Sequence, residues 1–141
     1  MKTIKKTIQL IIFSMLLRVK DFVECCRVVR RYFAIKRFAF SWCWLKCCYL
    51  LGNPYRCSRQ YASKQDNSDE LIYGETPLSV LEKIALEANI SAQDHVFELG
   101  SGSGYTCLWL NCVIGCRVTA IEKVPVFCWH LGRVTKRFHL G

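Results

Sequence analysis

The segment ELGSGSG (residues 98–104) separates a short apolar run at 95–97 from a run at 105–111 that can be helical. A second apolar run, 118–121, is followed directly by the acid Glu122. Strand, glycine turn, helix, strand and acid is the order in which proteins bind an adenosine-containing cofactor. The glycines allow a tight turn and a close approach of a ligand to the backbone. The sequence therefore predicts a βαβ unit in which Glu122 accepts hydrogen bonds from ribose hydroxyls.

The spacing of the glycines distinguishes two cofactor classes. Read from Gly100 or from Gly102, the dinucleotide fingerprint G-x-G-x-x-G would need a third glycine where Tyr105 or Cys107 stands. The strand instead ends on the acid Glu98, and a carboxylate is unfavourable beside a pyrophosphate held by helix-end amides. A cofactor with a cationic amino-acid end is compatible with that acid. The pattern therefore indicates S-adenosylmethionine rather than NAD.

Residues 73–127 resemble the opening half of class I S-adenosylmethionine-dependent methyltransferases. Segment 98–104 is similar to the first motif of that family, and Glu122 is similar to the acid of its second motif. The segment YGETP at 73–77 resembles a stretch upstream of the first motif in a bacterial subgroup and in the non-SET histone lysine methyltransferases, where it lies over the cofactor. The resemblance covers about 55 of the 141 residues and implies a Rossmann-like α/β fold.

The resemblance also implies a set of cofactor-binding residues from the glycine turn, the strand ends and the upstream segment, namely Glu98, Gly100, Ser101, Gly102, Gly104, Glu122, Tyr73 and Glu75. It places Glu98 toward the amino group of the methionine and Glu122 at the ribose. No general acid, base or nucleophile is assigned, because the sulfonium is already activated and methyl transfer needs chiefly in-line alignment. The catalytic residues and the methyl acceptor are therefore left open.

The number of strands bears on whether the domain is complete. Only about two strands are predicted in the chain, whereas a complete domain of this family has seven. Two parallel strands leave open edges and an uncovered core. We therefore expect the front part of a methyltransferase, from a truncated reading frame or completed by another chain, with no turnover by the chain alone. The alternative is a membrane-associated, non-enzymatic protein with a vestigial half-domain.

Charge divides the chain into two segments. Residues 1–64 hold fourteen Lys/Arg and two acids, a net charge of +12, whereas residues 65–141 hold six Lys/Arg and nine acids, a net charge of −3. The first segment is also strongly apolar, at 8–17 and at 38–51. We predict a basic, helical membrane-surface segment at 1–64 and the N-terminal part of a methyltransferase domain at 65–141, joined through a polar linker at 52–70.

Neither apolar run reaches the roughly 18–20 residues that span a bilayer, and no A-x-A-like cleavage site follows the first run. Trp42, Trp44 and Tyr49 suit a membrane interface, and the lysines and arginines suit anionic headgroups. The sequence thus favours a cytoplasmic chain, peripheral on the inner face of the membrane. A basic helical cap packed on the domain is a second interpretation, and nucleic-acid binding is the least favoured one. Periodicity alone does not separate the three interpretations.

Local patterns predict the helices and strands and give no sign of a metal site. Apolar residues at helical spacing predict helices over 77–88, capped by Thr76, over 106–113 and over 125–138. Strands are predicted at 95–97 and 117–121. The ten cysteines contain no C-x-x-C pair and the three histidines are scattered, so the sequence predicts no metal site and reduced thiols.

Overall fold

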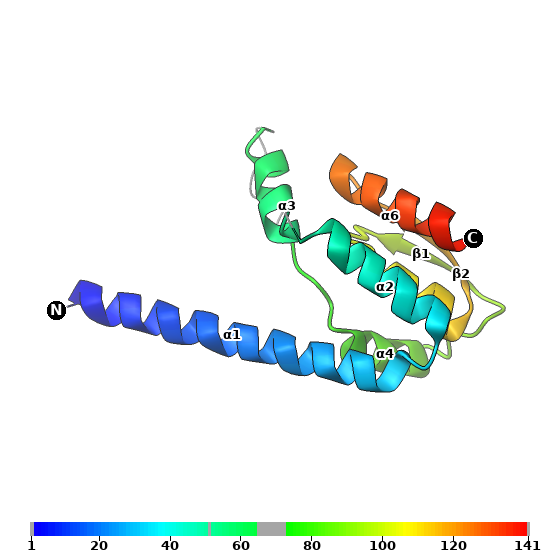
Figure 1. Cartoon of the computed structure of the whole chain (residues 1–141), viewed down its shortest axis with the longest axis horizontal. Coiled ribbons are helices and arrows are strands. Elements are labelled where there is room, and N and C mark those ends of the chain that lie inside the picture. Colours follow the sequence, from blue (N-terminus) through cyan, green and yellow to red (C-terminus); the bar gives the residue numbers. More distant parts are fainter. Residues whose placement is uncertain (1, 51, 65–72, 141) are drawn as a thin grey trace.

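Two strands, β1 (His95–Leu99) and β2 (Arg117–Ile121), pair in parallel and make a two-stranded sheet. The computed structural model describes residues 2–50, 52–64 and 73–140. His95 lies opposite Arg117 and Leu99 opposite Ile121, so the two strands are in register over their whole length. Both predicted strands are confirmed, and the fold is a mixed helical one with a small parallel sheet, of the α/β class (Figure 1).

The crossover between the strands is helical, as a parallel pair requires. It consists of α5 (Tyr105–Trp109) and a π-helical turn, η2 (Leu110–Ile114). Gly115 ends this turn with a φ of 88°, a left-handed conformation that glycine adopts without a Cβ penalty. The helix predicted at 106–113 is therefore confirmed, but the change to π geometry in its second half has no signal in the sequence.

Two further predicted helices flank the βαβ unit. α4 (Leu78–Glu87) precedes β1, and α6 (Pro125–Phe138) follows β2. The predicted capping of α4 by Thr76 is wrong, because α4 begins after Pro77 and has no side-chain cap from its own segment. The carboxylate of Glu24, far away in sequence, instead accepts hydrogen bonds from the Ser79 amide at 3.0 Å and the Ser79 hydroxyl at 3.1 Å.

The first half of the chain is helical, in α1 (Lys2–Tyr32), α2 (Lys36–Cys48) and α3 (Pro54–Ala62). α3 lies within the predicted linker, so that prediction is wrong for these nine residues. Asn53 caps α3 by accepting a hydrogen bond from Tyr55 N at 2.8 Å, and Pro54 occupies its first turn, which shows that an Asn-Pro pair can begin a helix as well as a turn. The remainder of that linker, from residue 65 on, lies outside the described residues.

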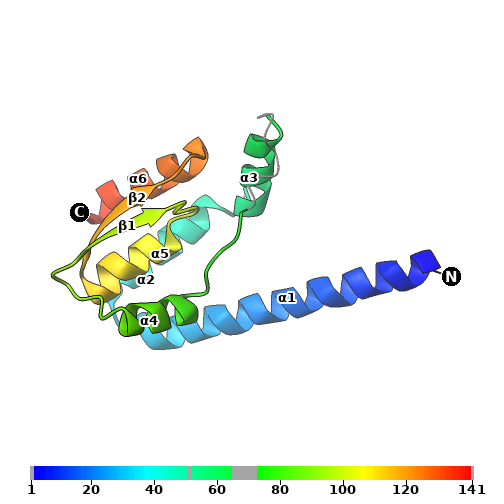
Figure 2. The same ribbon diagram turned by 180° about the vertical axis from the view of Figure 1, so that it is seen from behind.

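The hydrophobic core is shared between both halves of the chain. α2 packs against α5 and α6 (Figure 2). Phe38 of α2 and Trp109 of α5 are among the most deeply buried side chains, and the ring of Tyr32 in α1 makes edge contacts with both, at 5.8 and 5.7 Å between centroids. The basic segment therefore contributes core residues as well as surface.

The interfacial interpretation of the aromatic residues is wrong for Trp42 of α2 and for Tyr49, which caps the C-terminal end of that helix. These side chains are only 8 % and 7 % exposed. The ring of Trp42 contacts Phe33 at 5.4 Å, and the ring of Tyr49 contacts Phe127 at 6.1 Å, because α2 is covered by its neighbours in the fold. Trp44 remains partly exposed, at 39 %.

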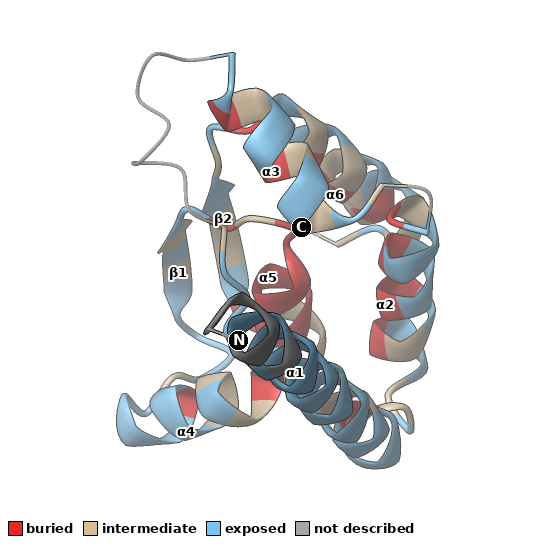
Figure 3. Cartoon of the chain, turned by 90° about the vertical axis from the view of Figure 1, so that its left-hand side faces the viewer, coloured by how far each residue is buried: buried red, intermediate tan, exposed pale blue. Residues whose placement is uncertain are grey.

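The two faces of the sheet differ. Val96 and Glu98 point toward α5 and are half-buried, whereas Phe97 and Leu99 alternate to the other face and are 60 % and 77 % exposed. Figure 3 shows α5 buried along its length, further buried residues on α2, and β1 on the outside. In the part of the chain that the structure describes, no helix has the length and apolarity to cross a bilayer.

Candidate functional site

The glycine turn connects the end of β1 to the start of α5. Gly100, Gly102 and Gly104 have φ angles of 74°, 52° and 87°, which residues with a Cβ rarely adopt. The amides of Gly100 and Ser101 donate to the carbonyl of Ile121 at 2.8 and 3.1 Å. The turn is therefore tied to the carboxyl end of the neighbouring strand, the edge at which parallel sheets bind ligands.

Glu122, the residue after β2, lies against this turn. Its Oε2 accepts a hydrogen bond from Gly102 N at 2.6 Å, and its Oε1 accepts from Lys123 N and Val124 N at 2.8 Å each. The side chain is half-buried between the turn and the N-terminus of α6. An ionised carboxylate has about four acceptor positions, so three backbone donors leave one position for a further hydroxyl.

Glu98 is the last residue but one of β1, and its side chain is turned toward α5. Its carboxylate accepts hydrogen bonds from the Thr106 hydroxyl and from the Cys107 thiol, the latter at 2.8 Å. Burial, with the negative charge of Glu98 beside it, raises the pKa of the Cys107 thiol well above its usual range, so the thiol stays protonated and donates. Glu98 therefore joins β1 to the first turn of α5 while lining the cavity at the glycine turn.

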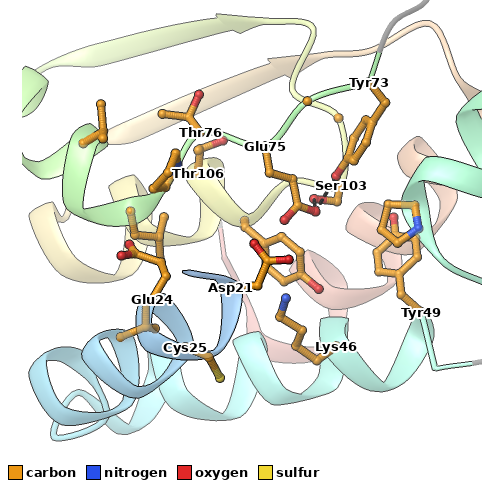
Figure 4. A pocket seen from close by; sticks show the side chains of 18 of the residues that line it. Asp21, Glu24, Cys25, Lys46, Tyr49, Tyr73, Glu75, Thr76, Ser103 and Thr106 are labelled. Atoms are coloured by element: carbon orange, nitrogen blue, oxygen red, sulfur yellow. Dashed lines mark hydrogen bonds between the residues drawn. The ribbon is translucent and has the colours of Figure 1, made fainter. Parts of the chain in front are cut away.

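The upstream segment lies over the glycine turn. The Tyr73 hydroxyl donates to Glu75 Oε1 at 2.5 Å, and the Ser103 hydroxyl donates to the same oxygen at 3.3 Å (Figure 4). A Cβ on Gly102 would lie 2.9 Å from Cε2 of the Tyr73 ring. Burial raises the pKa of Tyr73 above its usual range, and the charge of Glu75 adds to the shift. Tyr73 and Glu75 are thus held against the turn by direct contacts.

The glycines of the turn have different surroundings. Gly104 is buried, and a Cβ there would lie 2.6 Å from Cδ1 of Leu131 in α6. At Gly100 no atom of the described residues, apart from its two chain neighbours, lies within 4 Å of the corresponding position. Gly104 therefore allows α6 to pack closely on the turn, and Gly100 leaves its backbone open to a ligand.

A cavity of about 1000 Å³ adjoins the turn and extends to α1 and α2. Of the predicted site residues, six line it, namely Tyr73, Glu75, Glu98, Gly100, Ser101 and Gly102, whereas Gly104 and Glu122 lie outside its lining. Ser101 Oγ is buried beside the Cys107 thiol and makes no hydrogen bond of ordinary geometry among the described residues. The hydroxyl can therefore turn toward a ligand.

Helices far away in sequence supply the rest of the cavity wall. Asp21 and Glu24 come from α1, and Lys46 comes from α2 (Figure 4). Lys46 Nζ lies 4.3 Å from the centroid of the Tyr105 ring and 5.2 Å from that of Trp42. The sequence did not indicate these residues, because no motif or spacing connects α1 and α2 to the glycine turn.

The cavity is chemically suited to a ligand with a cationic group. Four carboxylates line it, from Asp21, Glu24, Glu75 and Glu98, together with the basic side chains Lys20, Arg27 and Lys46. Arg27 pairs with Glu24 at 2.8 Å, and the ring of Tyr73 lies beside the glycine turn. Asp21, Glu75 and Glu98 therefore offer negative charge to a cationic group.

Comparison with known proteins gives no relative. No family model, no curated protein and no solved structure matches the chain.

Proposed function

We propose that the chain binds S-adenosylmethionine at the glycine turn as the cofactor-binding part of a methyltransferase. One observation carries the proposal: the acid that follows β2 lies at the same sheet edge as the turn that follows β1. Glu122 Oε2 and Gly102 N are 2.6 Å apart although twenty residues separate them in sequence. This is the juxtaposition that a ribose over a glycine turn requires.

Each residue of the site has a separate task in this proposal. The open backbone at Gly100 allows close approach of the ligand, and the buried Ser101 hydroxyl offers it a hydrogen bond. Glu122 takes the ribose hydroxyls, by its remaining acceptor position and by releasing Gly102 N. Glu75 and Glu98 provide negative charge for the cationic end. The cofactor supplies an activated methyl group, and the protein aligns it.

Because the dinucleotide spacing of glycines is absent, we expect the site to prefer S-adenosylmethionine to NAD. A pyrophosphate at the turn would meet Glu98 at the end of β1 and Glu75 over Ser103. Repulsion between these two carboxylates and the phosphates disfavours NAD, whereas both acids attract a sulfonium.

Binding calorimetry on the full chain tests the proposal. We expect S-adenosylmethionine and S-adenosylhomocysteine to bind and NAD not to bind. Glu122→Ala weakens binding by about 1–3 kcal/mol, because hydrogen bonds to a charged group are lost. Glu87→Ala, an exposed acid at the end of α4, is the matched control and leaves the affinity unchanged.

The fold of each variant is checked by far-UV circular dichroism, because Glu122 also accepts bonds from the start of α6. Equal affinity in the wild type and a folded Glu122→Ala variant would remove the ribose assignment. No binding of either adenosyl compound by the folded wild type would favour the non-enzymatic alternative.

A further inference from the structure

α1 carries an exposed apolar stripe on the side opposite its buried residues Val28 and Tyr32, and one member of the stripe, Val19, also lines the cavity. Its members recur at intervals of three and four residues, and they are Ile12, Met15, Val19, Phe22, Cys26 and Val29. All six are exposed, the five large apolar ones by 42–69 %. At 3.6 residues per turn they share one side of the helix, which we call the outer face.

The opposite side of α1 faces the body of the protein. Val28 and Tyr32 are buried there, and Asp21 and Glu24 line the cavity. Glu24 is engaged by Ser79 of α4. The outer face is therefore an unpartnered surface of the described chain, and both acids of α1 lie on the other side of the helix.

Basic residues border the outer face. At about 100° per residue, Arg18 lies on one border, and Lys20 and Arg27 lie toward the other. Lys20 and Arg27 also line the cavity, and Arg27 pairs with Glu24 at 2.8 Å. Arg30 stands at the C-terminal end of the face, and all four side chains are exposed. An apolar stripe with cationic borders is complementary to a surface that is apolar inside and anionic at its edge.

The surroundings of the outer face favour a membrane over a second copy of the chain as its partner. Leu10, Phe13 and Leu17 lie off the stripe and are still 63 %, 60 % and 44 % exposed, because this half extends beyond the body (Figures 1 and 2). A second copy packed along the stripe would place the basic borders of two helices against each other. An anionic lipid surface covers the stripe and pairs its headgroups with those borders.

We propose that the outer face of α1 docks on an anionic membrane surface, with the helix axis along that surface. Docking in this way leaves the body, with the cavity that Asp21 and Glu24 line, on the side of α1 away from the lipid. The inference does not depend on what the cavity binds.

Flotation of the full chain with lipid vesicles tests the docking. We expect binding to phosphatidylcholine vesicles that contain phosphatidylglycerol, little binding to phosphatidylcholine alone, and release at high salt, because exposed charges are then screened. Phe22→Glu reduces the vesicle affinity at least about tenfold. Leu86→Glu on α4 is the matched control, since Leu86 and Phe22 are each 69 % exposed, and it leaves the affinity unchanged.

The basic border is tested separately. Arg18→Ala and Lys20→Ala each reduce the affinity for anionic vesicles about fivefold and leave binding to neutral vesicles unchanged. Val19→Gln replaces Phe22→Glu if the latter does not fold, as judged by circular dichroism.

Three results would overturn the proposal. The first is equal binding to neutral and anionic vesicles, or to neither. The second is a concentration-dependent dimer in analytical ultracentrifugation that Phe22→Glu abolishes without any vesicle binding, which would assign the face to a second copy. The third is preferential binding of duplex DNA through the same residues.

Discussion

Substitution of Gly104 by alanine tests how the glycine turn is held against α6. A Cβ at this position would lie 2.6 and 2.9 Å from the two terminal carbons of Leu131, a side chain that is only 8 % exposed. The φ of 87° adds a backbone cost of about 1–2 kcal/mol for a residue with a Cβ. Overpacking against a buried leucine adds about 1–3 kcal/mol. Gly104→Ala therefore lowers the free energy of unfolding by about 2–5 kcal/mol.

Gly100→Ala is the matched control for this substitution. Its φ is 74°, but no other residue in the described ranges lies within 4 Å of the new Cβ, so only the backbone cost of about 1–2 kcal/mol applies. Urea denaturation followed by far-UV circular dichroism measures both variants. In the background of Leu131→Ala the overpacking cost disappears, which a double-mutant cycle detects as coupling. Equal destabilisation by the two glycine substitutions would refute the packing role of Gly104.

Three other predictions concern contacts elsewhere in the fold. Glu24→Gln lowers the free energy of unfolding by about 1 kcal/mol in urea denaturation, because a neutral amide accepts more weakly from Ser79 at the start of α4, and Asp21→Asn does not. Tyr73→Phe costs about 1 kcal/mol by the same assay, since it removes the bond to Glu75 and keeps the ring. Burial, aided by the charge of Arg133, lowers the pKa of His130 from 6.5. As the pH falls, the unfolded chain therefore protonates at this histidine before the folded chain does, and stability present above pH 6.5 is lost. His130→Gln makes the urea midpoint decline less steeply with falling pH.

Local patterns predicted the elements whose structure is determined within a short stretch of sequence. β1 and β2 follow from β-branched and aromatic runs, and the conformation of Gly115 follows from its place after a helix. α6 begins at Pro125, as expected of a residue that tolerates only the first turn. In these cases the residues that specify the element are the residues within it.

Contacts between distant segments were not predictable in the same way. The cap of α4 comes from Glu24, more than fifty residues earlier, and replaces Thr76. Trp42 and Tyr49 look interfacial by composition, but packing of α2 against α5 and α6 buries them. Lys46 reaches the cavity for the same reason. Burial is decided by which helices cover one another, and a single sequence has no signal for that.

The candidate site contains some residues that the sequence predicted and some contacts that it did not. The glycine turn and Glu122 were predicted from their order along the chain, because parallel strands bring their carboxyl ends to one edge. The contact of Leu131 with Gly104 and the engagement of Glu98 by α5 were not predicted, because they depend on side-chain directions.

The most direct test of the cofactor proposal is a titration of the isotopically labelled full chain with S-adenosylhomocysteine, followed by amide resonances in NMR. We expect saturable shifts of the Gly100, Ser101 and Gly102 amides, with Lys123 N and Val124 N shifting as the Glu122 carboxylate turns to the ribose. Residues on the outer face of α1 should not shift. The absence of saturable shifts at the glycine turn, or shifts confined to other parts of the chain, would contradict the assignment of this site.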